Sequence, residues 1–215
     1  MKKNSPPHRL RASTMTDVLI VVVMIVLLTI VFLLIVNPAN LARRDQCASN
    51  LQRIGLGFFQ WASDNGDDLP WETSTNGGTL EFVGTTNVFL HFQAASNDLA
   101  SPRILVCPSD RGKTAASNFN QLADRNISYF IGLDSDILNP LLIMSGDRNL
   151  ATNGVALGSG VFSLNTNNAV GWTPAIHNNA GNIGFPDGSS QQLTPQGLQV
   201  QWLAATNAIR RLAIP

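Results

Sequence analysis

The feature that most constrains the fold of this chain is an uninterrupted apolar stretch near its N-terminus. From Val18 to Val36 there are nineteen residues without a formal charge, and Thr29 is the only polar one. Because an α-helix rises about 1.5 Å per residue, the stretch would be about 28 Å long, close to the roughly 30 Å hydrocarbon thickness of a bilayer. It therefore predicts a membrane-spanning helix. A buried core helix and the apolar part of a cleaved secretory signal are the alternatives.

The charges around this stretch predict its orientation. Residues 1–11 contain no acid and four basic residues, which are Lys2, Lys3, Arg9 and Arg11. Basic flanks stay on the cytoplasmic side, so the remainder of the chain would lie outside, in the periplasm of a bacterium. After Asn37 there are 13 acids against 10 Lys or Arg, and this mildly acidic balance argues against a nucleic-acid partner. Asp17, at the start of the apolar stretch, is a residue type suited to an N-cap.

Residues 38–66 predict an amphipathic helix. Apolar residues recur there at three- and four-residue spacing, namely Cys47, Leu51, Ile54, Phe58 and Trp61. Pro38 would kink the helix or end its first half, and Asn65-Gly66 would end it. One face of this helix is expected to pack on a globular domain.

From residue 67 onward, short apolar runs alternate with Gly, Asn, Asp and Pro, a pattern typical of strands joined by turns. The expected strands are residues 79–83, 104–107, 128–133, 141–145, 160–164, 175–177, 182–185 and 189–193. Pro186-Asp187-Gly188 predicts a tight turn that makes the last two strands a hairpin. Short helices are expected at residues 88–95 and 195–205, the second capped by Thr194. A helix followed by mostly antiparallel strands predicts an α+β fold.

Cys47 and Cys107 are the only cysteines in the chain. A disulfide between them would close a loop of about 60 residues and stabilise the fold by roughly 4 kcal/mol. Two buried free thiols are the alternative. The pair is a poor metal site by sequence spacing, because only two histidines lie outside the leader, His91 and His177.

The remaining polar residues give weaker hypotheses. Hard oxygen ligands on loops would suit calcium, at Asp134, Asp136 and Asp147, although acids in turns are commonly just solvated. No other cofactor is expected. His177 is expected to be structural and to bond across the hairpin to Asp187 or to backbone, and no base and nucleophile pair points to an enzyme. Trp71 and Trp172 could line a sugar-binding surface.

The order of these features resembles a known family. A basic leader, a small residue, four residues, an acid, a long apolar helix and an amphipathic extension are similar to type IV prepilins and type II secretion pseudopilins. The runs CASNLQRIGLGFFQWASDNG, ILVCPSD and ISYFIGLD resemble segments of pilin-like proteins from planctomycetes and verrucomicrobia. His177, nine further residues and Asp187-Gly188 resemble the His-x9-Asp-Gly signature of that group.

This resemblance implies processing and assembly. A prepilin peptidase would cut after Ala12, making Ser13 the first residue and Asp17 the fifth, and would methylate the new N-terminus. Ala12, Ser13 and Asp17 stand where the family usually has Gly, Phe and Glu. The fifth-position carboxylate would pair with the N-terminal amine of a neighbouring subunit during assembly.

The resulting division of the chain is a basic leader (1–12), a transmembrane helix (13–37), an amphipathic extension (38–66) and a periplasmic antiparallel-sheet domain (67–215). The expected function is that of a structural subunit of a type II secretion pseudopilus or type IV pilus-like filament. Its partners would be the prepilin peptidase, other pilin-like subunits, the inner-membrane assembly platform and the lipid bilayer. The expected location is the bacterial inner membrane, single-pass, with extraction into a filament after processing. The alternative is a membrane-anchored periplasmic binding module that does not assemble.

Overall fold

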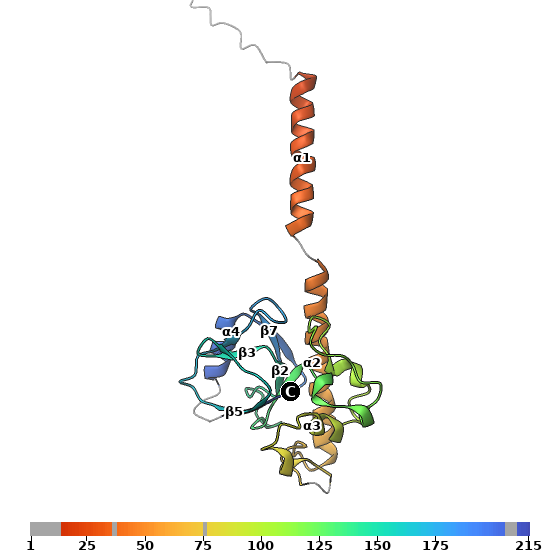
Figure 1. The fold of residues 1–215 in the computed structure, drawn as a ribbon, viewed down its shortest axis with the longest axis vertical. Helices are drawn as coiled ribbons and strands as arrows, with labels where there is room; N and C mark the ends of the chain where they lie inside the picture. The colour runs from red at the N-terminus through yellow and green to blue at the C-terminus, as the bar shows by residue number, and fades with distance from the viewer. Residues whose placement is uncertain (1–13, 36–37, 75–76, 205–209) are drawn as a thin grey trace, which may run out of the picture. The chain divides into compact units, whose positions relative to one another are not determined.

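A computed structural model describes residues 14–35, 38–74, 77–204 and 210–215. The chain divides into two units, Met1–Ala39 and Asn40–Pro215. The first unit contains helix α1 and the second contains the globular domain (Figure 1). The expected cleavage position, between Ala12 and Ser13, lies outside the described residues.

Helix α1, Met15–Ile35, begins with a reciprocal pair of hydrogen bonds. The backbone N–H of Asp17 donates to Oγ1 of Thr14 (3.4 Å), and the backbone N–H of Thr14 donates to Oδ2 of Asp17 (2.9 Å). This pairing is a capping box, which satisfies backbone donors that the first helical turn leaves free. Thr14 is therefore the N-cap, and the expectation that Asp17 occupies that position is wrong by three residues.

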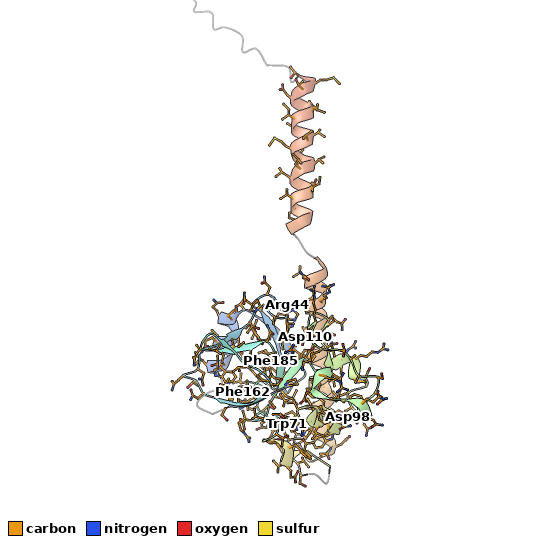
Figure 2. The ribbon with its side chains drawn as sticks, viewed as in Figure 1. Arg44, Trp71, Asp98, Asp110, Phe162 and Phe185 are labelled. Carbon is orange, nitrogen blue, oxygen red and sulfur yellow. A yellow bond between two sulfur atoms is a disulfide. The ribbon has the colours of Figure 1, made fainter. Side chains whose placement is uncertain are left out.

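Apolar side chains cover every side of α1 (Figure 2). From Val18 to Phe32, the large apolar side chains are between 48% and 66% exposed. The hydroxyl of Thr29 donates to the carbonyl of Val26 (2.8 Å), so the one polar side chain of the stretch is satisfied within its own helix. Within the described residues, α1 is the one helix long and apolar enough to cross a membrane, judged by length and composition.

Helix α2, Pro38–Asp64, buries the apolar face that the periodicity predicts. The side chains of this face are at most 6% exposed, and they are Cys47, Leu51, Ile54, Phe58 and Trp61. Pro38 is the first helical residue, a position where the missing N–H of proline costs no hydrogen bond. The helix ends before Gly66, which adopts a left-handed conformation (φ +78°) that glycine tolerates without a steric penalty.

From Tyr129 onward the domain contains two antiparallel sheets. The six-stranded sheet has the order β5-β9-β1-β2-β7-β8, with strands Gly160–Leu164, Arg210–Ile214, Tyr129–Gly132, Ser145–Asp147, Gly181–Gly184 and Ser190–Leu193. The three-stranded sheet has the order β4-β3-β6, with strands Val155–Ala156, Leu150–Thr152 and Val170–Trp172. The fold is therefore α+β with an N-terminal apolar helix and antiparallel sheets.

Among the described residues, five short helices lie between α2 and β1, and a sixth, α4, lies between β8 and β9. They are η1 (Leu80–Phe82), α3 (Phe89–Ala94), η2 (Pro102–Leu105), η3 (Phe119–Gln121), η4 (Asp124–Asn126) and α4 (Pro195–Ala204). The two expected helices correspond to α3 and α4, and Oγ1 of Thr194 accepts from the N–H of Gly197 at the start of α4 (3.1 Å).

Three of the expected strands are wrong, and a fourth, residues 141–145, shares only Ser145 with the observed strand β2. Residues 79–83 contain η1, and residues 104–107 overlap η2, which begins where Ser101 caps the N–H of Arg103 (3.3 Å) next to Pro102. Residues 175–177 form turns. There the chain reverses through Asn178 and Asn179, which both have positive φ, a conformation that asparagine accepts better than most residues.

The hydrophobic core has two parts. One part joins the buried face of α2 to β1 and to the short helices between them, and it includes Phe58 packed edge-on against Trp71 at 5.0 Å between ring centroids. The other part lies between the sheets and α4, around Phe130, Ile183 and Trp202. Helix α2 is thus held directly on the strand β1. The next two strands of the sheet, β2 and then β7, carry residues of the site described below.

Candidate functional site

Four donor side chains from distant parts of the sequence meet inside the globular domain. Cys47 lies on α2, Cys107 follows η2, Asp147 ends β2, and His177 lies between β6 and β7. One donor atom from each residue lies within 4.8 Å of those of the other three. These four residues are called the buried cluster below, because the side chains of Asp147 and His177 are 0% and 3% exposed and both cysteines are fully buried.

The local fold explains this meeting. The buried face of α2 carries Cys47, and the strand order β1-β2-β7 places Asp147 directly opposite Tyr129 on β1. The next strand, β7, carries Asn182, whose backbone N–H points at Asp147. The segment after η2 is held beside β1 because the N–H of Ser128 donates to the carbonyl of Leu105 (2.8 Å).

Cys47 and Cys107 are joined by a disulfide. The bond ties α2 to the segment that follows η2, across a sequence separation of 60 residues. A loop of this length corresponds to about 4 kcal/mol of stabilisation in the chain-entropy picture. Of the two alternatives that the sequence leaves open, the structure contains the bonded form.

Asp147, His177 and Asn182 form a buried polar network beside this disulfide. Oδ2 of Asp147 accepts hydrogen bonds from the backbone N–H (2.7 Å) and the side-chain amide (2.9 Å) of Asn182. The same oxygen lies 3.3 Å from Nε2 of His177. That ring nitrogen also lies 3.4 Å from Sγ of Cys107 and 3.3 Å from Nδ2 of Asn182. One imidazole nitrogen therefore touches every other part of the network.

The second oxygen of the Asp147 carboxylate is different. Oδ1 is buried and has no hydrogen-bond partner among the described residues, and the same holds for Oδ1 of Asn182. A buried acceptor without a donor costs free energy, and the cost is larger for a charged group. The network thus has unused acceptor capacity next to two sulfurs and an imidazole.

A tyrosine and an asparagine close the cluster on the α2 side. The amide of Asn50 donates to the carbonyl of Val106 (3.1 Å) and lies 3.4 Å from the hydroxyl of Tyr129. That hydroxyl donates to the carbonyl of Cys47 (3.5 Å). Burial raises the pKa of Tyr129 well above its ordinary value, and the nearby Asp147 carboxylate raises it further. The phenol is therefore neutral at physiological pH, and its hydroxyl hydrogen-bonds to Asn50 and to the carbonyl of Cys47 at the edge of the cluster.

A surface pocket of about 280 Å³ reaches the cluster from outside. Its lining includes Arg44 of α2 together with Ser109, Pro174 and His177. Arg44, labelled in Figure 2, extends toward the carbonyls of Gly181 (3.5 Å) and Leu193 (3.4 Å). The pocket gives solvent, or a small solute, a route to the imidazole edge.

The expected bond between His177 and Asp187 is wrong. The carboxylate of Asp187 instead accepts from the N–H of Ser189 (2.8 Å), and the Ser189 hydrogen bonds hold the pKa of Asp187 below its ordinary value. Gly188 has φ +77°, and the turn joins β7 to β8 as the sequence predicts. His177 reaches Asp147 because β7 lies against β2, a contact between residues thirty positions apart.

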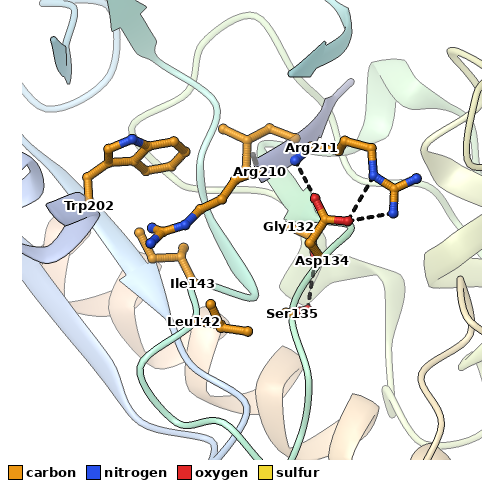
Figure 3. A pocket seen from close by; sticks show the side chains of 9 residues that line it. Gly132, Asp134, Ser135, Leu142, Ile143, Trp202, Arg210 and Arg211 are labelled. Carbon is orange, nitrogen blue, oxygen red and sulfur yellow. Dashed lines mark hydrogen bonds and ion pairs between the residues drawn. The ribbon is translucent and has the colours of Figure 1, made fainter. Parts of the chain in front are cut away.

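The three acids of the expected calcium site lie apart. Asp134 forms an ion pair with Arg211, whose Nε and Nη2 lie 2.8 Å and 2.5 Å from its Oδ1 (Figure 3). Asp136 accepts from the N–H of Leu138 (2.8 Å). Asp147 pairs with Tyr129 at the opposite end of β1 from Asp134. The structure therefore does not bring these carboxylates together, and Asp147 has cysteine and histidine neighbours instead.

The pocket beside Asp134 is too small to hold a ligand. It measures about 10 Å³, close to the minimum for one water molecule. The guanidinium of Arg210 lies 4.7 Å from the ring centroid of Trp202 and forms its wall (Figure 3). Trp71 and Trp172, the residues expected to line a sugar-binding surface, are only 1% and 5% exposed.

Sequence reasoning did not anticipate the role of Asn182 or the meeting of Asp147 with the cysteines. A signal was present: Asp147 directly follows the apolar run of residues 141–144 and two small residues, a context in which a carboxylate is expected to be buried and paired. Asn182 begins an expected strand but carries no motif. Only the strand order places these residues next to each other.

The cluster combines a disulfide-bonded cysteine pair with a carboxylate and an imidazole. In the bonded form it holds a disulfide against a polar network, and with two free thiols it would present four ligands of three types (Cys, Asp and His) that occur in metal sites. No protein-family model, curated protein or solved structure matches this chain.

Proposed function

We propose that this chain is a structural subunit of a type II secretion pseudopilus or a related type IV pilus-like filament, assembled through its N-terminal helix. The observation that supports this most is the exposure of apolar side chains on all sides of α1, from Val18 to Phe32. Such a helix is stable only in lipid or among other apolar helices. A filament subunit would meet both environments, because its helix lies in lipid before assembly and among other apolar helices afterwards.

The start of α1 supports an assembly role for Asp17. A carboxylate at the edge of an apolar helix is costly unless it reaches water or a partner. Its Oδ2 accepts from the N–H of Thr14, so one oxygen is engaged in capping and Oδ1 is left for a further partner. After cleavage between Ala12 and Ser13 by a prepilin peptidase, the new amine of a neighbouring subunit would be that partner and would fix the register of the bundle.

The charge distribution and the disulfide support the proposed location. In this proposal the basic residues of the leader keep the N-terminus in the cytoplasm, and the domain Asn40–Pro215 lies in the periplasm. A disulfide between Cys47 and Cys107 suits that oxidising compartment. The partners are then the peptidase, other pilin-like subunits, the inner-membrane platform and, before extraction, the lipid bilayer.

A membrane-anchored binding module is the second candidate. A shallow groove of about 500 Å³ beside β6, with Gly154, Gly171 and Pro174 in its lining, supports this alternative. A binding module would keep its anchor in the bilayer permanently and would need no new N-terminus.

The N-terminal residue of the mature chain tests the proposal. The full chain is co-expressed with a prepilin peptidase, extracted from membranes, and analysed by intact mass and N-terminal sequencing. The expected product begins at Ser13 and carries one added methyl group. A product that begins at Met1 would support the permanent anchor, and one that begins at Arg43 would show removal of the helix; either result contradicts assembly through α1.

A further inference from the structure

We propose that the buried cluster is a zinc site when Cys47 and Cys107 are reduced, with Asp147 and His177 as the other two ligands. The disulfide and the metal site are then two exclusive states of the same four residues. This inference does not depend on the filament role, because it follows from the interior of the globular domain alone.

The distances support a four-coordinate site. Zinc binds thiolate sulfur at about 2.3 Å and imidazole nitrogen or carboxylate oxygen at about 2.0–2.2 Å, so ligand atoms on a tetrahedron lie roughly 3.3–3.8 Å apart. Nε2 of His177 already lies 3.4 Å from Sγ of Cys107 and 3.3 Å from Oδ2 of Asp147. All four donor atoms lie within 4.8 Å of one another. The two sulfurs, now bonded to each other, must separate to reach this spacing once their bond is broken.

The other oxygen of the Asp147 carboxylate, Oδ1, is an independent indication that this residue can bind a cation. Oδ2 is held by the backbone and side-chain amides of Asn182, whereas Oδ1 is buried and unpaired among the described residues. Metal-binding carboxylates are characteristically fixed through hydrogen bonds to outer residues. Asn182 would supply that support by orienting the carboxylate, while a bound cation would compensate for the charge that the domain otherwise buries.

The types of ligand select the metal. Two thiolates and one imidazole favour zinc, whereas calcium requires a shell of six to eight oxygens. The pocket of about 280 Å³ that reaches His177 provides an entry path. Arg44 donates to the carbonyl of Gly181, the residue before Asn182. Its positive charge would offset part of the negative charge of the four ligands.

The change between the two states balances as a thiol–disulfide exchange. A dithiol reductant transfers two electrons and two protons, so that its own sulfurs form a disulfide while Cys47 and Cys107 become thiols. Zn²⁺ then binds both sulfurs and displaces the two protons into solvent. Oxidation of the cysteines would release the metal, because a disulfide sulfur is no longer a thiolate ligand.

The test uses the full chain in detergent micelles. The disulfide is reduced with a water-soluble phosphine, which takes up oxygen from water to become the phosphine oxide as the cysteines become thiols. After anaerobic removal of the phosphine, Co²⁺ is titrated as a spectroscopic substitute and is then displaced by Zn²⁺. The expected result is one metal per reduced chain, with tetrahedral visible bands and thiolate charge-transfer absorption, and no such bands in the oxidised chain.

Matched variants separate this site from adventitious binding. Asp147→Asn and His177→Gln should each lower the zinc affinity of the reduced chain by more than about 100-fold. Loss of a residue that only supports a ligand typically lowers metal affinity by roughly 10–100-fold, so a larger loss indicates direct binding. Asp187→Asn, at an exposed carboxylate, and His91→Gln, at a buried histidine outside the cluster, should leave it unchanged. Zinc should also protect both thiols of the reduced wild-type chain from alkylation.

Two results would overturn the proposal. One is a reduced wild-type chain that shows no tetrahedral Co²⁺ spectrum and no protection of its thiols. The other is a spectrum that persists unchanged in both Asp147→Asn and His177→Gln, since the metal would then be bound by the sulfurs without the other two residues. The wild-type measurement decides the matter even if a variant fails to fold.

Discussion

His91 is a histidine that burial keeps neutral. It is 1% exposed, its Nδ1 lies 2.7 Å from Oγ1 of Thr79, and its ring packs edge-on against Trp71 at 6.0 Å between centroids. Removal from water disfavours the charged imidazolium, and this lowers the pKa of His91 from 6.5 to about 4. The histidine therefore couples folding to pH, although it lies outside the candidate site.

The sign of this coupling gives a prediction. Above about pH 6.5 His91 is neutral in the folded and unfolded chains alike, so its full contribution to stability is present. Between about pH 6.5 and pH 4 the unfolded chain takes up a proton that the folded chain refuses, and stability should fall by about 3 kcal/mol over that range. We expect His91→Gln to lose that part of the pH dependence, measured as the difference in denaturant midpoints of the full chain near pH 7 and pH 4.5.

Comparison of the wild-type chain with His91→Gln isolates the contribution of His91 to the pH dependence of stability. Both chains contain the same carboxylates that titrate in this pH range. Tryptophan fluorescence follows unfolding, since Trp71 lies beside His91 in the core. An equal loss of stability with falling pH in both proteins would contradict the assignment.

Helix α2 approaches the β7–β8 turn more closely than a side chain would allow. A Cβ atom on Gly55 would lie 3.0 Å from Cα of Gly188 and 3.1 Å from the carbonyl oxygen of Phe185. Both neighbours are backbone atoms, and the turn that carries them is fixed by the left-handed conformation of Gly188. The glycine in the helix thus permits the helix and the hairpin to share one core.

This contact reverses the usual effect of replacing glycine in a helix. Alanine normally stabilises a helix by about 1 kcal/mol relative to glycine, whereas overpacking a close contact costs about 1–3 kcal/mol. We expect Gly55→Ala to lower the free energy of unfolding of the full chain by about 1 kcal/mol, measured by chemical denaturation.

Gly197→Ala in α4 is the matched control. The nearest atom to a Cβ there is the mobile end of the Leu193 side chain, at 3.2 Å, so this substitution should be neutral or slightly stabilising. If Gly55→Ala stabilises the chain as much as Gly197→Ala does, α2 does not pack on the turn as described.

Sequence reasoning predicts those elements whose structure depends on residues close together in the chain. The buried face of α2 follows from side-chain spacing, and the β7–β8 hairpin follows from the turn chemistry of Asp187 and Gly188. Strand β9 is different, because it pairs with β5 and β1, which lie about 50 and about 80 residues earlier in the chain. Its position depends on contacts such as Ile131 with Ala213, which no local pattern encodes.

The same distinction applies to the candidate site. The two cysteines could be paired from the sequence because there are only two of them. The addition of Asp147 and His177 requires the strand order, since the four residues span 130 positions (from residue 47 to residue 177) and come from four different segments. The sequence expectation of calcium did not anticipate that β2 carries Asp147 into the interior, where its neighbours are a disulfide and an imidazole.

At the scale of the whole molecule, the chain combines two units that are suited to different surroundings. Met1–Ala39 contains an apolar helix suited to lipid or to other helices, and Asn40–Pro215 contains a core closed by a disulfide. The proposed filament requires both, because the helix would supply cohesion between subunits and the domain would form the surface. Asp17 is the residue through which cleavage of the leader would change the behaviour of the entire subunit.

The most direct test of assembly is the recovery of this chain in filaments. Cells that carry a prepilin peptidase and a complete assembly platform express the wild-type chain, Asp17→Glu or Asp17→Asn, and sheared surface filaments are collected by sedimentation and identified by mass. We predict that the wild type and Asp17→Glu enter the filament fraction, while Asp17→Asn is cleaved at Ser13 but stays in the membrane. Retention of the cleaved wild-type chain in the membrane, or equal recovery of Asp17→Asn in filaments, would contradict assembly through this helix.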